Sequence, residues 1–76
     1  MTLENLFKLA QDLAKNGSFT AEGHRANVAV LALPGNVCRA VLAAAAQMPK
    51  RTKSPARIAA GEQAAREILM DILQPS

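Results

Sequence analysis

Very few side chains in this sequence can perform covalent chemistry, and the first of them is the single cysteine, Cys38. It stands two positions after Asn36, which we expect to cap a helix, and next to Arg39. Backbone N–H groups at a helix start and nearby cations are typical surroundings of reactive thiols. A nucleophilic thiol also needs a base, for which His24 is the candidate, or a resolving cysteine, which the sequence lacks. We interpret Cys38 as a small buried apolar residue, with a reactive thiol as the alternative.

Polar side chains that are close in sequence form no catalytic or metal-binding motif. The tetrad Glu22-Gly23-His24-Arg25 gathers three functional groups, but one helical turn brings at most two of them together, and Glu22 suits the first turn of a helix. Glu62, Glu67 and Asp71 spread around one helix without a histidine. One cysteine and one histidine cannot supply the three or four ligands of a zinc site. We therefore predict that the protein is not an enzyme and has no catalytic, cofactor-binding or metal-binding residues.

Length and composition limit the core that this chain can build. A chain of 76 residues buries only about 60% of the surface that it exposes when unfolded. Half of the residues are apolar, but sixteen of them are alanines and only Phe7 and Phe19 are aromatic, so each buried position contributes little. A single cysteine excludes an internal disulfide, and we expect self-association, as a homodimer, to supplement the core.

The longest apolar region, residues 28–46, is interrupted by Pro34, Gly35 and Arg39. An arginine at the centre of a membrane span costs about 3 kcal/mol, so we expect this region to be buried inside a soluble protein and not in a membrane. Glu4 comes early in the chain, and no cationic stretch precedes an apolar run as in a signal peptide. From these features we expect a cytoplasmic protein.

Apolar residues at three- and four-residue spacing, together with start and stop signals, predict four helices. Thr2 is the expected cap of the first helix and Asn36 of the third, and Ser54 followed by Pro55 is a strong start signal for the fourth. The expected helices span residues 3–15, 21–33, 37–48 and 55–73. The sequence thus predicts a small all-α bundle of about four helices, in a single domain covering residues 1–76.

The second of these segments allows another interpretation. Residues 27–33 form a short apolar run of the kind found in buried strands. The sequence offers no second β-branched segment to pair with it, and an isolated strand leaves its backbone groups unsatisfied. We therefore predict a helix, capped by Ser18 or Thr20.

The third helix, residues 37–48, is almost uniformly apolar, with Arg39 near its start and Gln47 near its end. Such a helix is normally enclosed by its neighbours, and the alanine run 43–46 allows another helix to approach closely. We expect this helix in the centre of the bundle or against its copy in a second subunit. The turn before it, residues 33–36, also fits a helix-turn-helix motif, but a buried helix with so few polar side chains cannot read base edges.

Four cations and no acid follow the third helix, and they are Lys50, Arg51, Lys53 and Arg57. A loop between apolar helices needs charge, and cations at the C-terminal end of a helix complement its dipole, which accounts for one or two of them. The net charge of the whole chain is only +3, so this segment supplies the excess of positive charge. Such a patch attracts phosphates or acidic protein surfaces. A solvated loop and a binding patch are the two interpretations.

Together these features predict a small non-enzymatic interaction protein, a regulator or inhibitor-type adaptor that needs no cofactor. It would bind a macromolecule through its helix faces and the basic segment at residues 50–57. The partner would be a protein with an acidic surface or a nucleic acid. The alternative is a dimeric DNA-binding protein of low sequence specificity, which the isoelectric point of about 9.6 permits.

Overall fold

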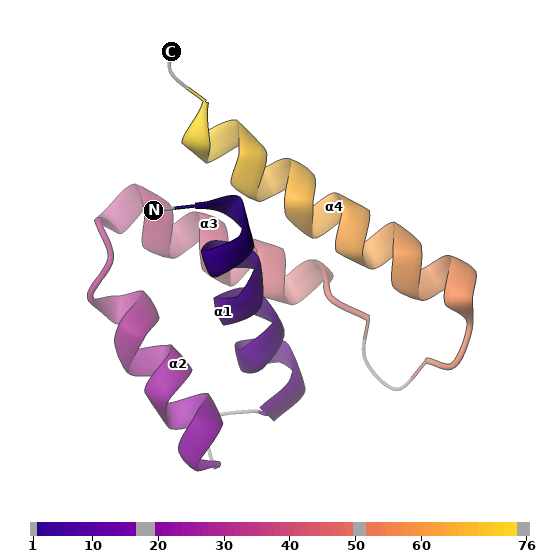
Figure 1. The fold of residues 1–76 in the computed structure, drawn as a ribbon, viewed down its shortest axis with the longest axis horizontal. Coiled ribbons are helices and arrows are strands. Elements are labelled where there is room, and N and C mark those ends of the chain that lie inside the picture. Colours follow the sequence, from indigo (N-terminus) through magenta and orange to yellow (C-terminus); the bar gives the residue numbers. More distant parts are fainter. Residues whose placement is uncertain (1, 17–19, 50–51, 75–76) are drawn as a thin grey trace.

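The structure, a computed structural model, describes residues 2–16, 20–49 and 52–74. Within these ranges it consists of four helices and has no strand (Figure 1). The helices are α1 (Leu3–Asn16), α2 (Ala21–Leu31), α3 (Gly35–Gln47) and α4 (Pro55–Leu73). The all-α fold predicted from the sequence is confirmed, and the run at 27–31, which could also have formed a strand, is helical.

Side-chain caps begin three of the helices as the sequence predicts. Thr2, Thr20 and Ser54 each accept a hydrogen bond from the backbone N–H three residues later, at 3.2, 3.0 and 3.4 Å. These bonds satisfy donors that have no partner inside the first helical turn. In α4 the cap is followed directly by Pro55, whose fixed φ angle suits the first position of a helix.

The predicted cap of the third helix is wrong. α3 begins at Gly35, and its N-cap residue is Pro34, which makes no side-chain cap hydrogen bond. The carbonyl oxygen of Pro34 instead accepts the first helical hydrogen bond, from the N–H of Cys38 at 2.8 Å. Asn36 therefore lies inside the first turn, because the proline already supplies the extended conformation that an N-cap residue needs.

The end of α2 also differs from the prediction, by two residues. The helix ends at Leu31 and not at Leu33, whose N–H bonds to the carbonyl oxygen of Val30 at 3.1 Å. This hydrogen bond spans three residues and not four, so the chain tightens into a turn before Pro34. The proline thus ends the helix earlier than at the residue directly before it.

The four helices form a flat molecule. α1 and α3 each contact all three other helices, and α3 lies behind α1 in Figure 1. Within the described ranges α2 and α4 do not contact each other. The Cα atoms extend over 35 × 30 × 15 Å, and the shortest of these dimensions has room for about two layers of helices, which pack with axes about 8–10 Å apart.

Each helix contributes one large side chain to the centre of the core. These fully buried side chains are Leu6, Val30, Val41 and Leu69. Small side chains lie between them and let the helices approach closely; Ala10, Ala44 and Ala65 are also fully buried. The expectation that α3 is enclosed by its neighbours holds for one side only, because Leu42, Ala43 and Ala46 are exposed.

A close approach at Gly61 fixes where α4 crosses the end of α3. A Cβ atom at this position would lie 2.7 Å from the carbonyl oxygen of Gln47 and 2.7 Å from Cδ of Pro49. Only a residue without a side chain allows the two backbones to come so close. Beyond this crossing, the first turns of α4 lie at the edge of the molecule, away from α2 (Figure 1).

Candidate binding surface

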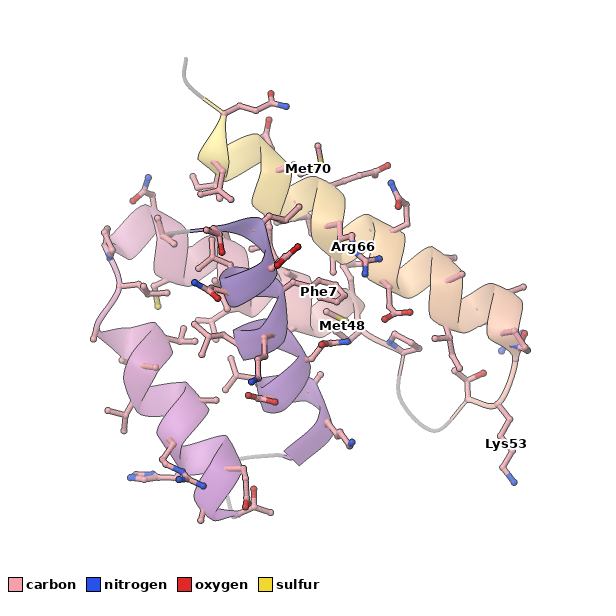
Figure 2. The ribbon with its side chains drawn as sticks, in the orientation of Figure 1. Phe7, Met48, Lys53, Arg66 and Met70 are labelled. Atoms are coloured by element: carbon pink, nitrogen blue, oxygen red, sulfur yellow. The ribbon has the colours of Figure 1, made fainter. Side chains whose placement is uncertain are left out.

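The structure describes two of the four cations that the sequence singles out. Lys50 and Arg51 lie outside the described residues, whereas Lys53 precedes α4 and Arg57 belongs to its first turn. Both described side chains are exposed, and Figure 2 shows Lys53 pointing away from the helices. Neither forms an ion pair with a carboxylate of the described ranges.

Lys53 and Arg57 lie where the helix dipole favours the opposite charge. They flank the cap residue Ser54, and the N-terminal end of a helix carries partial positive charge that is stabilised by anions. The first turn of α4 contains no acidic residue. α1 has the favourable arrangement, with Glu4 in its first turn and Lys15 in its last. At α4 the two cations and the helix terminus therefore add their positive potentials in one place.

The solvated-loop interpretation uses cations that complement the C-terminal end of the third helix. The last turn of α3 has no basic residue, and Lys50 and Arg51, which follow it, lie outside the described residues. Lys53 and Arg57 lie instead at the N-terminal end of α4. Small apolar side chains are exposed beside them on the first turns of α4, namely Ala56, Ala59 and Ala60. The basic tip, defined as residues 52–60, thus combines cations with apolar surface.

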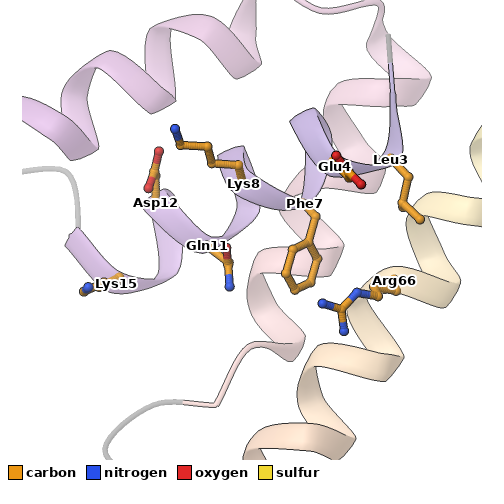
Figure 3. A pocket seen from close by; sticks show the side chains of 8 residues that line it. All are labelled: Leu3, Glu4, Phe7, Lys8, Gln11, Asp12, Lys15 and Arg66. Carbon is orange, nitrogen blue, oxygen red and sulfur yellow. The ribbon is translucent and has the colours of Figure 1, made fainter.

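A groove between α1 and α4, of about 580 Å³, is a second surface feature and was not predicted (Figure 3). Its lining residues are Leu3, Glu4, Phe7, Lys8, Gln11, Asp12, Lys15 and Arg66. The guanidinium carbon of Arg66 lies 4.2 Å from the centroid of the Phe7 ring, which is a cation–π geometry. No local pattern links these two residues, because they meet only when α4 packs on α1.

The groove has no set of groups that favours one chemistry. Its carboxylates, Glu4 and Asp12, alternate with the cations of Lys8, Lys15 and Arg66, so no single sign of charge dominates. Neither cysteine nor histidine lines it. In the parts of the chain that the structure describes, no group of three or more His, Cys, Asp or Glu residues is placed to hold a metal ion.

The other side chains that could take part in a chemical reaction lie apart from the basic tip. Cys38, on α3, is half-buried and packs against the core. His24, on α2, is exposed. In the same tetrad Arg25 and Glu22 form an ion pair at 3.8 Å, with both side chains largely exposed, as expected for a solvated first turn.

No protein-family model, no curated protein and no solved structure matches the chain. Within the described ranges, none of the helices has the combined length and apolar character that crossing a bilayer requires. The function therefore has to be inferred from the surfaces themselves, and the basic tip is the surface with the most distinctive electrostatics.

Proposed function

We propose that this chain is a small non-enzymatic interaction protein, of the regulator or inhibitor-adaptor kind, which self-associates in the cytoplasm. It binds an anionic macromolecule through the basic tip, with Lys50 and Arg51 extending the positive charge of Lys53 and Arg57. The supporting observation is the placement of the last two at the start of α4. Exposed cations there interact unfavourably with the helix dipole, and each lowers the stability of the helix by about 0.3–1 kcal/mol. A bound anion would offset this loss of stability.

Apolar surface at the basic tip favours a protein partner over a nucleic acid. Ala56, Ala59 and Ala60 are exposed on the turns that follow the cations. An acidic protein surface can cover such residues while it pairs with the charges, since protein interfaces combine an apolar centre with a polar rim. A phosphate backbone contacts the cations alone. A dimeric DNA-binding protein of low specificity is the alternative outcome of the experiment below.

The first test replaces Lys50, Arg51, Lys53 and Arg57 by glutamate and measures binding to two probes, a poly-glutamate peptide and a labelled DNA duplex. We expect the variant to lose both interactions and to keep its helical circular dichroism, because exposed charges contribute less than about 1 kcal/mol to stability. Retained affinity in a folded variant contradicts the proposal. It would mean that the cations only solvate the connection between two apolar helices.

A matched pair of variants separates local charge from net charge. Lys53→Glu with Arg57→Glu changes the net charge by the same amount as Lys8→Glu with Lys15→Glu on α1. We expect only the first pair to weaken binding, by about tenfold or more for two charge reversals. Equal losses in both pairs would show attraction to the whole molecule and not to the basic tip.

The salt dependence of wild-type binding then decides the class of partner. Affinity for DNA falls steeply with salt, with a logarithmic slope of about −0.9 for each phosphate neutralised. Affinity for a folded acidic protein changes less, because charge there mainly speeds the encounter. Tighter binding to the duplex with a steep slope would replace the protein-binding proposal by the DNA-binding alternative.

A further inference from the structure

Charged side chains are almost absent from one continuous part of the chain. Between residues 26 and 49, which include the second half of α2 and all of α3, the only charged residue is Arg39. Its Nε donates a hydrogen bond to the carbonyl oxygen of Gly35 at 3.3 Å, so the side chain folds back along the first turn of α3. The exposed residues with aliphatic side chains in this region lie on α2 and α3 and on the turn between these two helices, which contact each other; they are Val28, Ala29, Leu31, Ala32, Leu42, Ala43 and Ala46. We call them the apolar α2–α3 surface.

Three large side chains of this surface are unusually open to solvent. The exposed fractions are 54% for Val28, 65% for Leu31 and 45% for Leu42. Single exposed apolar residues are common on protein surfaces, but groups of them with few charged neighbours mark contact sites. Here the charged neighbours are Arg25, one turn before Val28, and Arg39, one turn before Leu42. The flatness of the molecule explains the exposure of Leu42, because α3 lies behind α1 in Figure 1 and the thickness of 15 Å leaves no room for a third layer over it.

Met70 on α4 is equally exposed, at 45%, and provides a contrast. Its neighbours on the helix surface are the charged residues Arg66, Glu67 and Asp71, all exposed. An isolated apolar side chain among charges needs no partner. Exposure alone therefore does not distinguish Leu42 from Met70, whereas the number of charged neighbours does. Leu42 has one on its helix, Arg39, whose side chain folds back along the first turn of α3.

The total exposed area is larger than that of a typical folded monomer. A monomer of 8.0 kDa is expected to expose about 4,500 Å², whereas this chain exposes 5297 Å². The excess, roughly 800 Å² over the whole chain, is of the size that one partner contributes to a protein–protein interface of standard size. A chain with this much exposed area can bury one such interface against a second copy.

We infer that a second copy of this chain covers the apolar α2–α3 surface. This inference rests on the self-association in the proposed function and locates the dimer interface on α2 and α3. Two copies that each carry a net charge of +3 repel one another least where each has the fewest exposed charges, and residues 26–49 contain only the charge of Arg39. A two-fold axis brings the same surface of both copies together, and Leu42 of one copy then packs over the alanines of the other, whose small side chains allow close helix contact.

The test compares the oligomeric state of the wild type with that of Leu31→Glu, Leu42→Glu and Met70→Glu, by sedimentation equilibrium over a wide range of concentration. We expect the wild type to approach twice the mass of one chain, 8.0 kDa. The two variants on the apolar α2–α3 surface bury a charge without a partner, which should raise the dimer dissociation constant by about 100-fold or more. Met70→Glu, at a position of equal exposure, should leave it unchanged.

Circular dichroism of each variant checks that the fold is retained, and Ala46→Glu replaces Leu42→Glu if the helical signal of that variant falls. If neither Leu31→Glu nor Leu42→Glu weakens the dimer, or if Met70→Glu dissociates it, the interface lies elsewhere. Either result overturns the inference but leaves self-association intact. A wild type that is monomeric throughout overturns both the inference and self-association. Binding of the anionic probes by the basic tip is measured separately, so its failure is distinguishable from either result.

Discussion

The two parts of α4 differ in how much of their surface is buried. In residues 62–73, Leu69 and Ala65 are fully buried, and three more apolar side chains pack against the core. In residues 55–61, most side chains are exposed, and none belongs to the core. Gly61, at the boundary, holds the helix against the end of α3.

This difference shows how one helix of a very small domain can contribute to the core and also carry the proposed binding surface. The buried turns of α4 fix the position of the whole helix, because a helix moves as a rigid element. The exposed turns are then oriented without making core contacts of their own, and their residue types are not restricted by packing. Substitutions in the two parts of α4 should therefore have separable effects on stability and on binding.

The largest effect that we expect comes from Leu69→Ala, compared with Ile58→Ala on the same helix. Leu69 is fully buried, and its truncation leaves a cavity that costs about 2–5 kcal/mol, most of the stability of a domain of this size. Ile58 is only half-buried and lies outside the core, so we expect a loss of no more than about 1.5 kcal/mol. Urea denaturation measures both, and equal losses would contradict the division of α4.

A smaller effect is expected from Gly61→Ala, at the boundary between the two parts. The new Cβ would meet the backbone oxygen of Gln47 at 2.7 Å, and overpacking of this kind costs about 1–3 kcal/mol. Alanine recovers up to about 1 kcal/mol through its higher helix propensity, so we expect a net loss of about 1–2 kcal/mol.

Gly35→Ala is the matched control for this substitution. No atom lies within 4 Å of a Cβ at that position, so the free energy of unfolding should stay the same or rise by up to about 1 kcal/mol. Thermal denaturation of both variants measures the difference. A stabilising Gly61→Ala would show that α4 can shift at the crossing.

The smallest change in stability is expected from Arg57→Glu, and its sign is the informative part. Glutamate at this position complements the dipole of α4, which stabilises by about 0.3–1 kcal/mol. Binding to the poly-glutamate probe should weaken at the same time. Lys15→Glu is the control, since it removes a favourable cation from the last turn of α1 and should lower stability without affecting binding. Parallel changes of stability and binding in Arg57→Glu would remove the distinction between the two parts of α4.

Local signals in the sequence predict most of the fold. The bounds of α4 agree with the prediction because Ser54 and Pro55 together specify a helix start. The bounds of α1 agree to within one residue for a similar reason, with Thr2 as its cap. At the turn between α2 and α3 the prediction was less accurate, because Pro34 acts on both sides of itself. It shortens the helix before it and begins the next one without the help of Asn36.

The surfaces could be predicted only in part. The cations at 50–57 are visible in the sequence, but their relation to the dipole of α4 depends on where that helix begins. The contact of Arg66 with Phe7 and the approach at Gly61 depend on how distant helices pack, which no spacing rule contains. An apolar helix such as α3 also predicts burial without saying which of its faces stays open, because that depends on the number of layers around it.

The contribution of one large side chain from each helix to the core also has a consequence for the order of events during synthesis. Leu6 emerges from the ribosome early, but Leu69, which completes the same core, is translated more than sixty residues later. At about 5–20 residues per second, about 3–13 s pass between the synthesis of Leu6 and that of Leu69, and about 1–4 s between the end of α3 and Leu69. During this time the faces of α1 and α3 that pack on α4 are uncovered. Chaperones that bind emerging chains therefore have a period in which they can bind these faces. This period ends only when the second part of α4 has left the exit tunnel.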